Sequence, residues 1–316
     1  MENCTNSRLL ENISLIDVYL SIIEIVILSI SLVLNVIIVA SVCCSPRLHT
    51  FSNIFVVSLA VSDILFAAAS ESPSAIVLYV ANTRQELPCS LALQCMCLYL
   101  VFCSLICSRF GHLVVIVERW LYIAWPFVHQ RVITTKSTIC CLIFVCMISM
   151  LSGVHVITDC GNSRVEFMIG YATVDVYIHF VVSGLMLVIY VRIGFIIRRQ
   201  SVAILKFQLT ANSSVGNPNR RMTWNIVRLP ITIFGTFFLS VTPFVVGNIY
   251  VYVLIGNPSY YRNYTAYDVL RIISLFHTWT NFFVYVLQDK DFRTVLKCYL
   301  IKIGNAVLRP KIYPVN

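Results

Sequence analysis

The most constraining feature of the sequence is a long apolar run that ends in two adjacent charges. Residues 95–117 contain one strongly charged side chain, Arg109, and the run continues into Glu118 and Arg119 before Pro126. A run of about 20 apolar residues is long enough to cross a bilayer as a helix. The sequence therefore predicts a membrane-spanning helix with an acid–arginine pair where hydrocarbon meets water.

The composition excludes an ordinary soluble protein. Hydrophobic residues make up 59% of the 316 residues and charged residues 12%, whereas the charged share of soluble domains is about 25%. The net charge is +9, and the positions of the basic residues are more informative than this total. Of the 23 lysines and arginines, 17 fall in four segments: Arg47, 119–136, 192–228 and 290–311. Basic residues mark cytoplasmic loops. This pattern predicts an extracellular N-terminus, a cytoplasmic C-terminus and an odd number of spans.

Seven apolar segments meet that requirement. We expect an all-α membrane protein, a seven-transmembrane helix bundle with spans at 18–43, 51–80, 95–126, 137–157, 170–197, 224–254 and 267–287. Residues 1–17 form the predicted extracellular N-terminus, 18–287 the transmembrane domain, and 288–316 a short amphipathic helix and cytoplasmic tail. Residues 198–223 are expected to be a polar, basic inside loop. The N-terminus lacks the pattern of a cleaved signal peptide, so the first span is expected to direct membrane insertion.

Cysteines and glycosylation signals agree with this topology. Most of the 13 cysteines are scattered through apolar runs, where they are small packing residues rather than a disulfide framework or a zinc site. Sequons on the predicted outside provide three glycosylation candidates: Asn3, Asn12 and Asn263.

Two charged residues inside the predicted spans are candidates for function. A carboxylate in mid-membrane is costly unless it is paired or hydrated, so Asp63 is either functional or bonded only to its helix neighbours. Arg109 is likewise either functional or paired with a neighbouring helix for structure. The sequence leaves both alternatives open.

Spaced residues along the chain resemble class A (rhodopsin-like) G-protein-coupled receptors. That family has an Asp/Glu-Arg-Tyr signature followed by Pro seven residues after the Arg, which Glu118, Arg119 and Pro126 match. Further matches are Asn35, Asp63, Ser108, Tyr190, Phe237, Pro243, Asn281 and Tyr285. Trp120, Val241 and Phe282 depart from the family pattern. In the family, the Asn of span one hydrogen-bonds to the Asp of span two, which implies an Asn35–Asp63 contact.

The resemblance implies a cell-surface receptor rather than an enzyme. In the family, an extracellular ligand shifts an equilibrium in which helix six swings outward and a heterotrimeric G protein docks. The residues implied are Glu118 and Arg119 as a resting charge pair, Tyr190 and Tyr285 as partners of Arg119 in the active state, and Phe127 as an apolar contact for the G protein. Phe237, Pro243 and Asn281 complete the activation set.

Three further sites are implied by the resemblance alone. Asp63, Ser108 and Asn281 match members of a sodium site in which the ion acts as a modulator. A disulfide joins the loop after span four to span three, which implies Cys160 with Cys95, while Cys89 stays open as an alternative. The implied ligand pocket is lined by Glu24, Glu71, Val101, Phe102, Leu105, Phe244, Asn248, Arg271 and Leu275. Arg271 either binds an anionic ligand or pairs with Glu24 or Glu71.

Two other functional classes remain open from the sequence. The lost Trp and Pro motifs permit a non-signalling seven-span decoy or scaffold, and the intramembrane charges permit a channel or transporter. The expected partners are an extracellular ligand, a heterotrimeric G protein and membrane lipids, without nucleic acid. The expected location is the plasma membrane.

Overall fold

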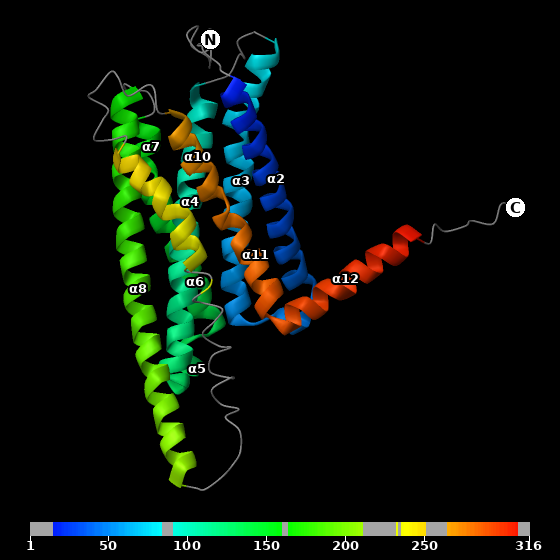
Figure 1. Cartoon of the computed structure of the whole chain (residues 1–316), viewed down its shortest axis with the longest axis vertical. Coiled ribbons are helices and arrows are strands. Elements are labelled where there is room, and N and C mark those ends of the chain that lie inside the picture. Colours follow the sequence, from blue (N-terminus) through cyan, green and yellow to red (C-terminus); the bar gives the residue numbers. More distant parts are fainter. Residues whose placement is uncertain are drawn as a thin grey trace, which may run out of the picture.

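The computed structural model describes residues 15–83, 91–159, 164–210, 235–250 and 264–308, together with Thr232. Within these residues the regular elements are helices, and no strand occurs. In chain order they are α2 (Leu15–Cys44), η1 (Pro46–Leu48), α3 (Phe51–Thr83), α4 (Leu91–Ala124), α5 (Pro126–Val132), α6 (Thr135–Ser152), α7 (Val154–Asp159), α8 (Arg164–Thr210), α10 (Tyr264–Leu275), α11 (His277–Gln288) and α12 (Lys290–Leu308). A further apolar helix, Gly235–Tyr250, follows α8 in the sequence and is yellow in Figure 1.

The long helices form one elongated bundle from which α12 projects sideways (Figure 1). Six stretches of the described helices are long and apolar enough to cross a membrane: Leu15–Cys44, Phe51–Glu71, Ala92–Ala124, Thr135–Thr158, Ala172–Gln200 and Ala266–Leu287. The helix Gly235–Tyr250 lies where the sequence predicts the sixth span. The predicted fold class is confirmed, and the chain is a multi-pass membrane protein.

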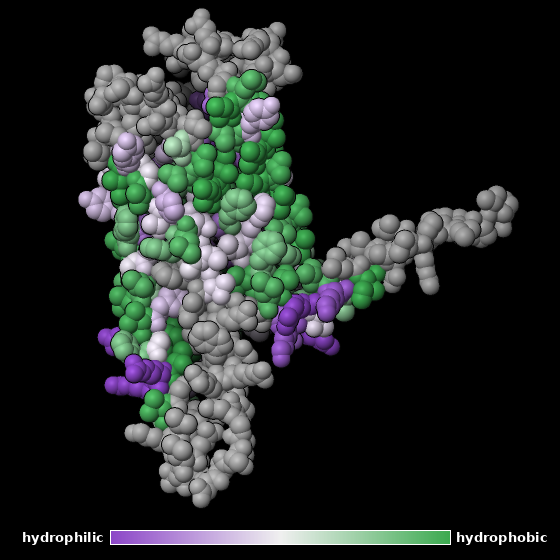
Figure 2. All heavy atoms as spheres, in the orientation of Figure 1, coloured by the Kyte–Doolittle hydropathy of each residue, from purple (hydrophilic) through white to green (hydrophobic). Residues whose placement is uncertain are grey.

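The outer surface of the bundle is apolar, as contact with lipid requires. Large hydrophobic side chains stay exposed along the helices, including Phe144 at 64% and Leu187 at 54%. Figure 2 shows a continuous hydrophobic flank, with hydrophilic residues gathered on the lower part of α8 and the start of α12. Helices suit this environment because they satisfy their own backbone hydrogen bonds.

Proline sets the end of the helix that carries Glu118 and Arg119. The helix α4 stops at Ala124, and Trp125 adopts φ −140° and ψ 72° before Pro126 begins α5. The proline ring disfavours helical geometry at the preceding residue but suits the first turn of a new helix. The chain therefore turns immediately after the charge pair, and α5 folds back beside it.

The fifth span is longer than the sequence predicts. We expected an inside loop from residue 198, whereas α8 continues to Thr210. Residues 198–210 contain no glycine or proline and include good helix formers such as Ala203, Leu205 and Lys206. Polarity marks where this helix leaves the hydrocarbon, but it does not end the helix.

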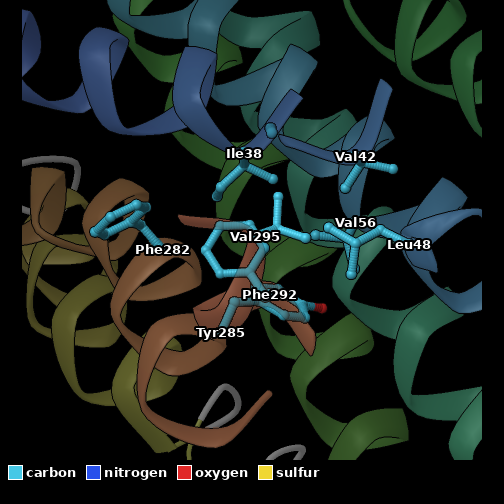
Figure 3. Close-up of a cluster of buried hydrophobic side chains, with 9 residues drawn as sticks. Ile38, Val42, Leu48, Val56, Phe282, Tyr285, Phe292 and Val295 are labelled. Carbon is cyan, nitrogen blue, oxygen red and sulfur yellow. The ribbon is translucent and has the colours of Figure 1, made fainter. Parts of the chain in front are cut away.

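An apolar cluster joins α12 to the end of the bundle at which Arg119 lies, which we call the Arg119 end. Side chains from α2, η1, α3, α11 and α12 converge there (Figure 3): Ile38, Val42, Leu48, Val56, Ala60, Phe282, Tyr285, Phe292 and Val295. The Asp289 carboxylate accepts hydrogen bonds from the backbone N–H groups of Asp291 and Phe292 at 2.8 and 3.0 Å, which caps α12. The predicted amphipathic helix thus starts where expected, and the cluster holds Tyr285 in place.

The break between α6 and α7 yields a test of packing. A Cβ added at Gly153 would lie 2.6 Å from Cys103 Sγ and 3.0 Å from the Tyr99 ring. We expect Gly153→Ala to lower stability by roughly 1–3 kcal/mol because α4 must move away. Gly184→Ala is the matched control, since its Cβ would meet no atom within 4 Å. Equal melting temperatures of the two variants in detergent would contradict this close packing.

Candidate functional site

Glu118 and Arg119 lie in the last two turns of α4. The Glu118 side chain is 3% exposed and that of Arg119 is 25% exposed. Arg119 Nε lies 3.4 Å from Glu118 Oε2, and neither atom has a hydrogen-bond partner among the described residues. The contact is therefore an ion pair without a well-formed hydrogen bond.

Glu118 is held more closely by two residues from other elements. Its Oε1 atom accepts a hydrogen bond from Ser52 Oγ of α3 at 2.9 Å. The same oxygen lies 2.9 Å from His129 Nε2 of α5. The turn at Pro126 is what brings His129 back to this position. The buried carboxylate thus ties α3, α4 and α5 together, and it does so without depending on Arg119.

The other predicted G-protein-coupling residues lie at the same end. Tyr285 is 3% exposed, its hydroxyl has no hydrogen-bond partner among the described residues, and the charges of Arg119 and Glu118 act on it. Tyr190 of α8 packs against the buried cluster formed by Ile116, Val182 and Met186. Phe127 of α5 is 86% exposed. The structure therefore gathers a cation, a buried phenol and a protruding apolar ring at one end.

Phe237 lies above this end among three buried histidines. It is 1% exposed and stacks on the His112 ring at 4.8 Å. The rings of His277 and His179 lie 6.0 and 6.1 Å away. Pro243 lies within the helix Gly235–Tyr250, which continues past it in helical geometry. Phe237 thus connects this helix to α4, α8 and α11.

Asp63 is fully buried and bonded to two other spans. Its Oδ1 atom accepts from Ser108 Oγ of α4 at 3.1 Å, and Oδ2 accepts from Asn281 Nδ2 of α11 at 2.9 Å. The alternative in which Asp63 bonds only to its own helix is therefore wrong. The expected Asn35–Asp63 contact is also wrong, because Asn35 Nδ2 donates to the Thr278 carbonyl at 3.1 Å and to Ser31 on its own helix.

The Asp63 cluster fits the chemistry of a hard cation. A carboxylate, the Ser108 hydroxyl and the Asn281 amide supply oxygen atoms. Asn281 Oδ1 is buried without a partner among the described residues, and Asp63 forms no ion pair with a described basic residue. The residues predicted for sodium are thus brought together with oxygen capacity to spare.

Arg109 pairs with Asp175 between α4 and α8. Arg109 Nη1 lies 2.5 Å from Asp175 Oδ1, and the side chains are 2% and 1% exposed. The same Nη1 atom lies 3.3 Å from the Asp175 carbonyl. Of the two alternatives, pairing with a neighbouring helix is what the structure contains. Arg109 is the basic residue in the apolar run 95–117 and Asp175 is the acid of the predicted fifth span, so complementary charge was the signal that could have identified the partner.

The opposite end of the bundle holds a second ionic cluster. Arg271 Nη1 lies 2.5 Å from Glu24 Oε1, and Arg271 Nε lies 3.6 Å from Asp268 Oδ1. Glu71, the other predicted partner of Arg271, accepts instead from Ser29 Oγ at 3.1 Å. The guanidinium is thus shared between two carboxylates.

The remaining predicted pocket residues separate into contacts of two kinds. Tyr267 donates to Asn248 Oδ1 at 2.8 Å and its ring lies 5.4 Å from Phe244. The apolar members belong to two buried clusters. Leu275 is part of a cluster against which Val101 and Leu105 pack, and Phe102 is part of a separate cluster with Ile106 and Val156. The sequence predicted Asn248 as a pocket residue, but it did not identify Tyr267, which donates a hydrogen bond to it.

Covalent features are only partly within the described residues. Cys95 is disulfide-bonded, and the predicted partner, Cys160, lies outside them. The sequons at Asn3, Asn12 and Asn263 also lie outside them. Nine other described cysteines are free, as their apolar surroundings in the sequence indicated.

Sequence reasoning missed Ser52 and His129 as partners of Glu118. His129 follows Pro126 by three residues, so a proline-started helix turning back beside the charge pair was a readable signal. Ser52 offered no comparable signal, because one serine at the start of a span is common.

Comparison with known proteins agrees with this geometry. Residues 34–285 match the family described as 7 transmembrane receptor (rhodopsin family). No curated protein matches the chain. The matched region includes Asn35 and extends through the Asp63 cluster and the Glu118–Arg119 pair to Tyr285. Because this match covers well over half of the sequence, the chain belongs to the rhodopsin family of seven-transmembrane receptors.

Proposed function

We propose that this receptor couples binding of an extracellular ligand to a heterotrimeric G protein through outward movement of its sixth helix. The supporting observation is the buried Glu118, held by Ser52 and His129 beside the partly exposed Arg119. In this position the carboxylate neutralises Arg119 in the resting state. A ligand activates the receptor by binding better to the form in which that pair is open.

The residues around Arg119 supply the partners for the open form. Tyr285 is buried and has a hydroxyl without a described partner. Tyr190 of α8 packs against the buried cluster of Ile116, Val182 and Met186. Movement of the helix Gly235–Tyr250 away from α4 admits these phenols to the Arg119 guanidinium, which donates to oxygen acceptors. Phe237 transmits the movement because its ring packs against residues of three other helices.

Phe127 supports a contact with a protein partner. An aromatic side chain with 86% of its surface exposed is costly in water and is typical of an anchor that fills a partner's pocket. It lies on α5, the short helix that also carries His129, the partner of Glu118. The G protein therefore meets Phe127 and Arg119 on one surface.

The proposed location is the plasma membrane, with Asn3, Asn12 and Asn263 as the proposed glycosylation sites. The N-terminus is extracellular, and the Arg119 end, α12 and the C-terminus are cytoplasmic. The ligand enters from the end that carries Arg271, Glu24 and Asp268. A disulfide between Cys95 and Cys160 completes that end.

The buried charges favour a receptor over a channel or transporter. Arg109 pairs with Asp175, Arg271 pairs with Glu24, and Asp63 is bonded to Ser108 and Asn281. Each group joins helices, as structural pairs do. An ion path instead needs charges that face water.

A first test removes the charge of Glu118. We expect Glu118→Gln to raise basal G-protein activation about fivefold or more, because the amide no longer attracts Arg119. Ser52→Ala is the control, since it removes one donor and leaves the ion pair intact. Activation is recorded with several co-expressed G proteins, alone and with acidic lipids, nucleosides and peptides. A silent Glu118→Gln receptor at normal surface level would favour a decoy or scaffold.

A second test addresses sodium at Asp63. Asp63, Ser108 and Asn281 would hold the ion, which stabilises the arrangement of α3, α4 and α11 when bound. We expect sodium chloride to raise the melting temperature of the purified receptor relative to choline chloride, and we expect no such difference for Asp63→Asn. The neutral amide keeps the size of the side chain but loses the charge that attracts the cation. Equal responses to both salts in the unmodified receptor would exclude the site.

A further inference from the structure

A groove on the side of the molecule is not explained by the proposed signalling residues. It lies between the last turns of α4 and the middle of α8, and it has a volume of about 720 Å³. Trp120, Ala124 and Trp125 line one side of it, while α8 lines the other. Its position is close to the Arg119 end but on the outer flank of the bundle.

The groove changes in character along α8. Leu187, Val188 and Val191 line its upper part, and each of these side chains is at least half exposed. Arg192 and Arg199 line its lower part, with Phe195 and Ile196 between them. The arginines thus lie in the lower part of a lining that extends about 18 Å along α8 at 1.5 Å per residue. This is the polarity of a lipid molecule with an anionic head.

The arginines of the groove have no acidic partner in the part of the chain that the structure describes. None of the described residues that line the groove is acidic. Within the described residues, no carboxylate lies within ion-pair distance of Arg192 or Arg199. A second hollow of about 460 Å³ continues along α8 and adds Arg198. Figure 2 shows hydrophilic residues on this lower part of α8, beneath the hydrophobic flank.

The aromatic residues of the groove also suit a lipid. The rings of Trp120 and Trp125 meet edge to face at 4.9 Å, and Trp125 is 51% exposed. Trp120 Nε1 is a hydrogen-bond donor without an acceptor among the described residues. Tryptophan is enriched where acyl chains meet head groups, because its ring is apolar and its N–H is polar.

We propose that this groove binds one anionic phospholipid, with an acyl chain against Leu187, Val191 and Trp120 and the phosphate at Arg192 and Arg199. Guanidinium groups bind phosphate through charge-assisted hydrogen bonds. The lipid bridges α4 and α8 one residue from Arg119. The site requires neither the extracellular ligand nor the G protein, so its test is independent of the proposed signalling function.

The test measures quenching of tryptophan fluorescence by brominated lipids. The full-length receptor in detergent is titrated with dibrominated phosphatidylglycerol or dibrominated phosphatidylcholine. We expect half-maximal quenching at a roughly tenfold lower concentration of the anionic lipid. Replacing Trp120 and Trp125 by Phe is expected to remove this component, whereas replacing the other two of the four tryptophans, Trp224 and Trp279, by Phe is expected to leave it.

Charge variants decide whether the groove is responsible. Arg192→Gln with Arg199→Gln is expected to raise the half-maximal phosphatidylglycerol concentration about tenfold. The matched control, Lys290→Gln with Lys297→Gln, removes two exposed charges of α12, which line neither hollow, and is expected to change that concentration less than about twofold. Val191→Phe fills the apolar part without changing charge and is expected to weaken binding of both lipids. Equal curves for the two lipids, or equal losses in both double variants, would overturn the proposal.

Discussion

Replacing Arg119 by Ala is expected to abolish G-protein activation while the receptor still reaches the cell surface. The loss follows because Tyr190, Tyr285 and the docked partner then lose the Arg119 guanidinium as their hydrogen-bond donor. We expect ligand-independent and ligand-driven activation to fall at least about tenfold. Surface expression persists because Glu118 keeps Ser52 and His129 as partners, so its buried carboxylate is not left uncompensated.

The matched control for this variant is Arg131→Ala. Arg131 lies on α5 at the same end, is exposed, and forms no ion pair with a described residue. It therefore removes the same charge without touching the Glu118 contact. Surface level is measured by antibody binding to an N-terminal tag on intact cells, which also reports the orientation of that terminus. Full activation by Arg119→Ala would remove the central step of the proposed mechanism.

The fold was predictable because lipid imposes simple rules on sequence. Apolar length identified the spans, whereas the third span was predicted to reach Pro126 and instead ends at Ala124, with the short helix α5 following it. Helix ends outside the hydrocarbon were less predictable, as the extension of α8 to Thr210 demonstrates. Water permits a helix to continue or to stop there, so the end depends on local propensity and packing rather than on hydropathy.

The charged residues of the site inside the membrane could be predicted from the sequence. The neutral polar residues that bond to them were harder to predict. Asp63, Arg109 and Glu118 stand out because burying a charge is costly. Their partners Ser108 and Asn281 followed from the family resemblance, whereas Ser52 depends on how α3 and α4 are rotated about their axes. The rotation of each helix depends on the packing of the whole bundle, and this packing cannot be predicted from the residue pattern of a single sequence.

Breaking the Arg109–Asp175 pair is expected to have the largest effect on stability. Asp175→Leu leaves a buried guanidinium without its carboxylate, and Arg109→Met leaves a buried carboxylate without its cation. Removing one partner of a buried pair costs about 3–5 kcal/mol. We expect each single variant to lose surface expression and to melt at a clearly lower temperature in detergent, if it can be purified at all.

The double variant Arg109→Met with Asp175→Leu separates charge from packing. Both side chains are almost fully buried, so apolar replacements of similar length refill the space and leave no unpaired charge. A buried pair replaced in this way is commonly neutral for stability or better. We therefore expect the double variant to recover most of the stability that each single variant loses. A double variant as unstable as the sum of the singles would mean that Arg109 and Asp175 act separately, each through contacts other than the one between them.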